Sequence, residues 1–152
     1  MAAFEMTRST TIAAPPERIH PLLDDFRAWQ QWSPWEGLDP NLQRTFTGPE
    51  RGVGSHYAWS GNSKAGQGTM EIIESTPTSV VVDLRFLKPI KATNLTRFDL
   101  TPGGAGTGVL WTMTGERGAV MGLMGKLYFD KAVGKDFDRG LAQLKSAAEA
   151  RG

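Results

Sequence analysis

The chain has 152 residues, of which 39% are hydrophobic and 22% are charged, so its composition excludes a disordered or fibrous protein. The 17 basic and 16 acidic residues give a net charge of +1, without the basic face that binding to nucleic acid requires. There are no cysteines, which excludes disulfides, thiolate metal sites and cysteine nucleophiles.

The length predicts one domain over residues 1–152, with a core that buries roughly two-thirds of the surface of the unfolded chain. The N-terminal residues lack the basic segment and apolar run of a secretion signal, and no segment approaches the roughly 18 apolar residues of a membrane span. We therefore expect a cytoplasmic protein without stable membrane insertion.

The first half of the chain predicts a strand over residues 4–12, followed by a short helix that begins at Pro16 and runs through Leu22. A second short helical piece is expected over residues 26–32. From Arg44 onward, glycines and prolines separate alternating segments at 55–60, 69–75, 79–87, 91–101 and 109–115, with a turn over 103–108. Because no helical pattern lies between these segments, they predict consecutive antiparallel strands joined by hairpins.

The last part of the chain changes to helical periodicity. Five apolar residues recur at the spacing of one helical stripe: Val133, Phe137, Leu141, Leu144 and Ala148. A long amphipathic helix is therefore expected to end an α+β fold. Met121, Met124 and Tyr128 lie on the opposite side of its wheel, with Gly122 and Gly125 between them. We expect a break or a loose first section there.

Alternation along the strands predicts which side chains face the helix. Even positions from Val80 to Phe86 are apolar, whereas Asp83 and Arg85 between them are charged. The same pattern places Tyr57, Trp59, Met70, Ile72, Asn94, Thr96, Phe98, Trp111 and Met113 inside, and Glu71, Glu74, Arg97 and Asp99 outside. One helix covers only part of so wide a sheet, so these large side chains either enclose a cavity or fill the interior as core.

Several polar and aromatic residues allow two interpretations. Arg8 shares the parity of Met6 and either reaches the interior or lies at the rim of the sheet. The tryptophans from Trp29 to Trp35 either form a pocket wall or seal one end of the sheet. His20 and His56 have no patterned carboxylate partners, so we expect both at the surface, and we expect no metal and no cofactor.

Seven segments together, in their order and spacing, resemble the START-like superfamily, also called the polyketide cyclase/dehydrase and lipid transport family. They are IAAPPERI (12–19), WQQWSPW (29–35), GSHYAWSG (54–61), GTMEIIESTP (68–77), FLKP (86–89), GTGVLW (106–111) and KDFDRGLAQLK (135–145). The resemblance covers nearly the whole chain. It implies a helix-grip fold, in which a curved seven-stranded antiparallel sheet wraps a long C-terminal helix and two short helices follow the first strand.

The resemblance also implies a hydrophobic cavity between the sheet and the C-terminal helix, with a small hydrophobic ligand, lipid or polyketide-like, as the partner. The entrance would lie at residues 121–128 and 61–68. The residues expected to bind the ligand are Trp32, Trp35, Tyr57, Trp59, Met70, Ile72, Phe86, Asn94, Thr96, Phe98, Trp111, Met113, Met124 and Tyr128. Two alternatives stay open: an aromatase/cyclase or dehydratase that uses the same cavity, although no catalytic constellation is readable, and a protein whose surface binds a partner protein.

Overall fold

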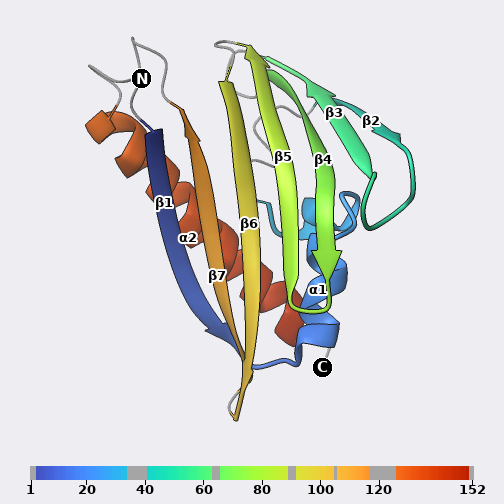
Figure 1. Cartoon of the computed structure of the whole chain (residues 1–152), viewed down its shortest axis with the longest axis vertical. Coiled ribbons are helices and arrows are strands. Elements are labelled where there is room, and N and C mark those ends of the chain that lie inside the picture. Colours follow the sequence, from blue (N-terminus) through green and yellow to red (C-terminus); the bar gives the residue numbers. More distant parts are fainter. Residues whose placement is uncertain are drawn as a thin grey trace.

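The computed structural model describes residues 3–33, 41–62, 66–88, 92–104, 106–116 and 126–150. A seven-stranded antiparallel sheet, with the order β1-β7-β6-β5-β4-β3-β2, curves around a long C-terminal helix (Figure 1). The strands are β1 (Ala3–Ile12), β2 (Gln43–Thr47), β3 (His56–Ser60), β4 (Gln67–Thr76), β5 (Ser79–Lys88), β6 (Ala92–Gly103) and β7 (Gly106–Glu116). The helices are α1 (Pro16–Leu23), the 3-10 helix η1 (Ala28–Gln31) and α2 (Lys126–Ala150). The expected α+β helix-grip fold is confirmed.

The β6–β7 hairpin is tighter than expected. The expected hairpin turn is present, but its expected extent over residues 103–108 is wrong, because β6 continues to Gly103 and β7 already begins at Gly106. The ladder persists through the pairs Pro102 with Thr107 and Gly103 with Gly106. Gly106 has a φ of 140°, and a Cβ there would collide with the carbonyl oxygen of Ile12. Only glycine therefore lets this hairpin lie against the end of β1.

The expected second helical piece over residues 26–32 is also wrong in extent, because only Ala28–Gln31 form a 3-10 helix. The two tryptophans of this segment fold back on α1. The indole Nε1 of Trp29 donates to the carbonyl oxygen of Leu23 at 2.8 Å, and that of Trp32 to the carbonyl oxygen of Leu22 at 2.7 Å. These bonds satisfy carbonyls at the end of α1 that the helix cannot pair, so side-chain bonds shape the segment more than helical propensity does.

Helix α2 buries one stripe against the sheet, formed by Phe137, Leu141, Leu144 and Ala148, as its periodicity predicts. Its last turns are tied to the end of β1 by polar bonds. Glu149 Oε2 accepts from the Ala13 amide at 2.9 Å, while Lys145 Nζ donates to Glu149 Oε2 at 2.7 Å and to the Thr11 carbonyl oxygen at 3.0 Å. The expected break at Gly122 and Gly125 lies outside the described residues.

The carboxylate of Glu149 predicts a specific pH response. The hydrogen bonds from Lys145 and from the Ala13 amide lower the pKa of Glu149 below its ordinary value. A lowered pKa in the folded state means that this stabilisation is present above about pH 4.3 and is lost as the pH falls through the lowered pKa. We therefore expect Glu149→Gln to be less stable than the wild type in urea at pH 7, with the difference shrinking below about pH 4. A difference independent of pH would contradict this assignment.

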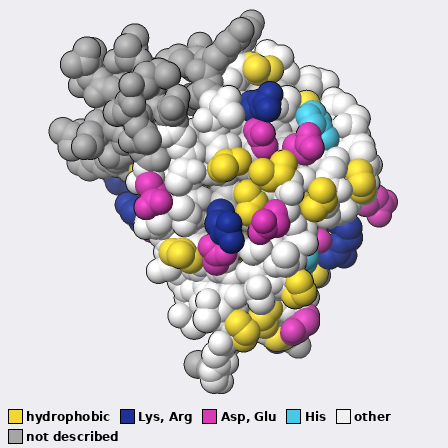
Figure 2. Space-filling view, viewed as in Figure 1, with side chains coloured by type: hydrophobic (Ala, Val, Ile, Leu, Met, Phe, Trp, Pro, Cys, Tyr) yellow, Lys and Arg dark blue, Asp and Glu magenta, His cyan; other side chains and the backbone are white. Residues whose placement is uncertain are grey.

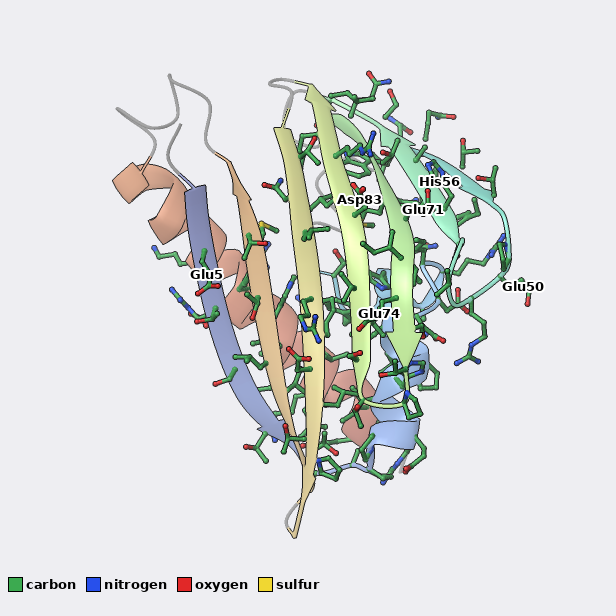
Figure 3. The ribbon with its side chains drawn as sticks, viewed as in Figure 1. Glu5, Glu50, His56, Glu71, Glu74 and Asp83 are labelled. Atoms are coloured by element: carbon green, nitrogen blue, oxygen red, sulfur yellow. The ribbon has the colours of Figure 1, made fainter. Side chains whose placement is uncertain are left out.

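The outer face of the sheet carries mixed charges among scattered apolar side chains (Figure 2). Glu71, Glu74 and Asp83 all project from this face (Figure 3). Ion pairs on this face form along one strand, where Arg85 Nε lies 3.1 Å from Asp83 Oδ1 and Arg97 Nε lies 3.0 Å from Asp99 Oδ1. Arg97 also pairs across strands, with Nη2 3.9 Å from Glu74 Oε2. The outer face is thus charged, whereas the large apolar side chains lie on the inner face, which faces the helices.

Candidate functional site

The strand register arranges the inward side chains in rows across the sheet. One row joins Tyr57, Met70, Leu84 and Asn94, and the next joins Ile72, Val82, Thr96 and Met113. A third row joins Val80, Phe98 and Trp111. The residues expected to bind a ligand therefore fall into two groups at different heights of the sheet, and their packing differs.

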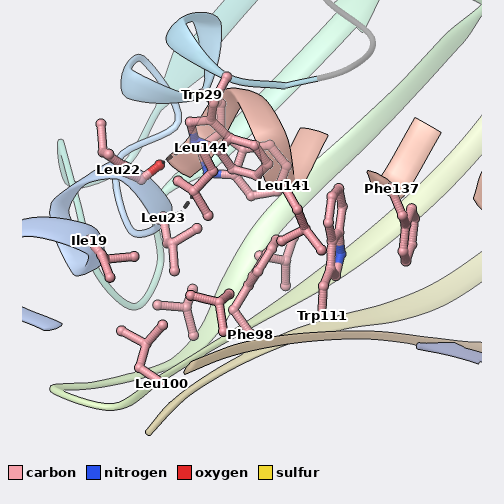
Figure 4. Close-up of a cluster of buried hydrophobic side chains, with 14 of the residues drawn as sticks. Ile19, Leu22, Leu23, Trp29, Phe98, Leu100, Trp111, Phe137, Leu141 and Leu144 are labelled. Atoms are coloured by element: carbon pink, nitrogen blue, oxygen red, sulfur yellow. Dashed lines mark hydrogen bonds between the residues drawn. The ribbon is translucent and has the colours of Figure 1, made fainter. Parts of the chain in front are cut away.

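The first group, which we call the Trp111 cluster, consists of Trp29, Trp32, Phe98, Trp111 and Phe137. All five side chains are buried, with exposed fractions of 4% or less. The rings of Trp111 and Phe137 are stacked with centroids 4.0 Å apart and planes at 6°, and Phe98 lies 5.0 Å from Trp111 (Figure 4). Trp32 contacts Phe98 edge to face at 5.7 Å. Aromatic rings thus fill this part of the interior, and Trp29 and Trp32 belong to the main core, not to a pocket rim or to a satellite cluster.

The second group, which we call the Trp59 wall, consists of Tyr57, Trp59, Met70, Leu84, Phe86 and Asn94. Trp59 lies stacked beside Tyr57 at 6.0 Å and edge to face with Phe86 at 5.9 Å. Both Trp59 and Phe86 are only partly buried, whereas Tyr57 and Met70 are 7% and 8% exposed. The wall therefore presents two large aromatic faces that the described residues do not cover completely.

Gly68 helps to form this wall and was missed by the sequence analysis. It pairs with Trp59 across the β3–β4 ladder, and a Cβ at Gly68 would collide with the indole ring. The ring can lie flat on the sheet only because position 68 has no side chain. A glycine inside a strand, opposite a tryptophan, is the signal that could have identified it.

Two polar side chains lie on the inner face where the Trp59 wall meets the next row. Asn94 and Thr96 are 4% and 2% exposed. Asn94 Oδ1 and Thr96 Oγ1 have no hydrogen-bond partner among the residues that the structure describes. A buried polar atom without a partner costs about 1–3 kcal/mol. Asn94 and Thr96 thus face inward as expected, and each has a buried oxygen that could still accept a hydrogen bond.

The remaining expected site residues have different outcomes. Ile72 and Met113 are fully buried in the row between the two groups. Trp35 and Met124 lie outside the described residues, as does the side chain of Tyr128, although its backbone belongs to α2. Of the two expected entrance segments, 61–68 is described except for residues 63–65 and 121–128 only from Lys126 onward.

The positions of Arg8 and of the two histidines differ in how closely they match the sequence-based expectations. Arg8 lies at the rim, with its side chain 41% exposed and Nε 3.4 Å from Asp138 Oδ1. The expectation that His20 lies at the surface is wrong: its side chain is only 17% exposed and its Nε2 lies 3.1 Å from Ser75 Oγ. His56 is partly buried and pairs with Glu71 in the ladder of the outer face. Across the described ranges, no three His, Asp or Glu side chains are grouped closely enough to hold a metal ion.

Comparisons with known proteins agree on the architecture. The family model described as polyketide cyclase / dehydrase and lipid transport matches residues 3–149. A crystal structure of a Mesorhizobium loti protein is similar with a TM-score of 0.72 at 14% identity, covering 98% of this chain and 99% of that one. A Chromobacterium violaceum protein has a TM-score of 0.68 at 17% identity, with 95% and 97% covered. The Aha1 dimer from Colwellia psychrerythraea has a TM-score of 0.65 at 18% identity, with 96% of each chain covered. These structures share the fold, and no curated protein sequence matches the chain.

Among the described helices, none is long and apolar enough to cross a membrane.

Proposed function

This chain belongs to the polyketide cyclase / dehydrase and lipid transport family, and from that premise we propose that it binds a small hydrophobic molecule on the inner face of its sheet, against the Trp59 wall. Members of this family share a fold suited to hydrophobic ligands. The proposal assigns the incompletely covered rings of Trp59 and Phe86 to contact with the apolar body of the ligand. Asn94 and Thr96 would hold its polar end.

The observation that carries the proposal is that Asn94 Oδ1 and Thr96 Oγ1 are buried and have no hydrogen-bond partner within the described part of the chain. An amide oxygen accepts a hydrogen bond, and a threonine hydroxyl both donates and accepts one. In the two rows that contain these residues, the described inward side chains carry no charge at neutral pH. The ligand that fits best is therefore largely apolar and carries a neutral oxygen group such as a hydroxyl.

Binding or carriage is favoured over a cyclase or dehydratase because the inner face at the Trp59 wall offers few groups that could transfer a proton. General acid–base catalysis needs a titratable group within reach of the bound molecule. Tyr57 is the one titratable side chain among the six residues of the Trp59 wall, and Arg44, which pairs with Trp59 in the β2–β3 ladder, adds a guanidinium that donates hydrogen bonds and is not a base. A phenol that keeps its proton can donate a hydrogen bond, but it supplies no base to remove a proton from a bound molecule.

The proposal is tested with a pair of neighbouring residues on β5. Phe86 belongs to the Trp59 wall, whereas Leu87 faces outward, with 40% of its surface exposed. We expect the wild type to bind 1-anilinonaphthalene-8-sulfonate and to release it when 1-decanol is added. Phe86→Ala should weaken binding of the dye about tenfold, since a buried aromatic side chain contributes about 1.5–3 kcal/mol. Leu87→Ala should leave it unchanged.

Native mass spectrometry of protein purified without denaturant supplies a second readout, because a retained ligand adds its own mass. Near-ultraviolet circular dichroism confirms that each variant is folded, since the dye also binds partly unfolded proteins. Equal dye affinity for the two variants, or no displacement by 1-decanol, would overturn the proposal.

A further inference from the structure

A second site lies at the opposite end of β4 from Gly68, beside helix α1 (Figure 1). An open pocket of about 350 Å³ is lined there by Glu17, His20, Pro21, Arg51, Ser75, Thr76 and Pro77. None of these residues belongs to the Trp59 wall or to the Trp111 cluster. The pocket combines two hydroxyls, an imidazole, a guanidinium and a carboxylate, so its chemistry differs from that of the apolar inner face.

Three side chains at this pocket form a chain of contacts. Ser75 Oγ lies 3.1 Å from His20 Nε2, and His20 Nδ1 lies 3.5 Å from Asp24 Oδ2. Asp24 is 4% exposed and is held by Arg51, whose Nη2 lies 3.0 Å from Oδ1 and whose Nε lies 3.3 Å from Oδ2. A hydroxyl, an imidazole and a buried carboxylate thus follow one another in the order found in serine hydrolases.

The carboxylate of Asp24 favours one of the two neutral tautomers of His20. An ionised carboxylate accepts hydrogen bonds and cannot donate them, so Asp24, whose Oδ2 lies 3.5 Å from Nδ1, favours a proton on that nitrogen. In the neutral imidazole Nε2 is then the acceptor, and it faces the Ser75 hydroxyl. In that tautomer Ser75 is the donor and Nε2 the acceptor of their contact, which is the arrangement that a general base requires.

Local features of the chain bring these residues together. The register shift between Ile72 and Glu74 is a β-bulge, after which Ser75 pairs with the inward-facing Val80. The bulge thus turns Ser75 toward the helices and lets both Glu71 and Glu74 face outward. His20 and Asp24 are four residues apart at the end of α1, and so lie on one side of it. The Gly52 amide donates to the Asp24 carbonyl oxygen at 3.0 Å and fixes the end of the helix.

We propose that Ser75, His20 and Asp24 form a nucleophilic site that hydrolyses small carboxylic esters. Ser75 Oγ attacks the acyl carbon while its proton moves to His20 Nε2. The bond from the acyl carbon to the leaving oxygen then breaks, and the released alcohol takes the proton from Nε2. Water attacks the acyl-serine in the same way, giving a proton to Nε2 that returns to Ser75 Oγ as the carboxylic acid leaves. Asp24 positions His20, and Arg51, which also lines the pocket, holds the carboxylate of Asp24 in place.

The experiment treats the full chain with a fluorophosphonate probe, which a nucleophilic serine captures with loss of fluoride, and locates the modified residue by peptide mass spectrometry. We expect labelling at Ser75 that is absent from Ser75→Ala and at least about tenfold slower in His20→Gln. Ser79→Ala is the matched control, because Ser79 Oγ contacts Glu74 and Thr76 instead of an imidazole. His56→Gln controls for the other histidine. An unlabelled wild type, or labelling that persists in Ser75→Ala, would overturn the proposal.

The rate of hydrolysis of 4-nitrophenyl acetate tests whether Asp24 positions His20 or only stabilises the fold. Asp24→Asn should lower kcat about tenfold or more while KM stays within about twofold, because the amide no longer holds the Nδ1 proton. Circular dichroism reports the folded fraction, and a loss of rate that merely follows that fraction contradicts the role of Asp24. Ser75→Ala should keep its affinity for 1-anilinonaphthalene-8-sulfonate, so failure here and failure of the proposed ligand site are told apart.

Discussion

Trp111→Ala is expected to lower the free energy of unfolding by about 3–5 kcal/mol, the range typical of removing a large buried aromatic side chain. Trp111 is fully buried, and its ring touches Phe137 of α2 on one side and Phe98 of β6 on the other. Its removal takes away the contact that joins α2 to the middle of the sheet. Urea denaturation monitored by far-ultraviolet circular dichroism measures the loss.

Leu110→Ala is the matched control for this substitution. Leu110 is the preceding residue of β7, faces outward and is 41% exposed, so its truncation should change the stability by about 0.5 kcal/mol or less. A cost below about 1 kcal/mol for Trp111→Ala would show that the Trp111 cluster is loosely packed. Ligand binding would then have to be sought there as well as at the Trp59 wall.

The sequence predicted the inner face well because alternation in a strand is a local property. Val80, Val82, Phe98, Trp111 and Met113 are all buried where period-two spacing placed them. The stripe from Phe137 to Ala148 was predicted for the same reason, since helical periodicity needs no knowledge of the partner. The family resemblance supplied what periodicity lacks, namely that sheet and helix enclose a shared interior.

Features that depend on contacts between distant segments were not predicted. His20 and Ser75 are 55 positions apart, and only the bulge after Ile72 turns the serine toward the histidine. Trp29 and Trp32 lie in a segment without periodicity, so their burial follows from indole bonds to the last carbonyls of α1. The division between a filled Trp111 cluster and a partly covered Trp59 wall likewise follows from ring contacts that no spacing of residues reveals.

Asn94→Leu combined with Thr96→Val should weaken binding of 1-decanol about tenfold while leaving binding of decane unchanged or stronger. The two ligands differ only by a hydroxyl, and a hydrogen bond of about 1–1.5 kcal/mol corresponds to roughly that factor. Both substitutions keep the branching and the number of heavy atoms of the side chain and remove the oxygens that have no partner among the described residues. Displacement of 1-anilinonaphthalene-8-sulfonate by each ligand gives the two affinities.

The same double variant should be as stable in urea as the wild type, or more stable by about 1 kcal/mol, because replacing unpaired buried polar groups by apolar ones removes their desolvation penalty. Leu95→Ala is the control on the same strand, since Leu95 lies between the two positions, faces outward and is 44% exposed. A loss of more than about 2 kcal/mol in the double variant would mean that these oxygens already have partners in the free protein. An equal loss of affinity for decanol and decane would show that they shape the wall without recognising the polar group. A protein that gains stability and loses selectivity is the signature of a site whose polar atoms are kept for a ligand.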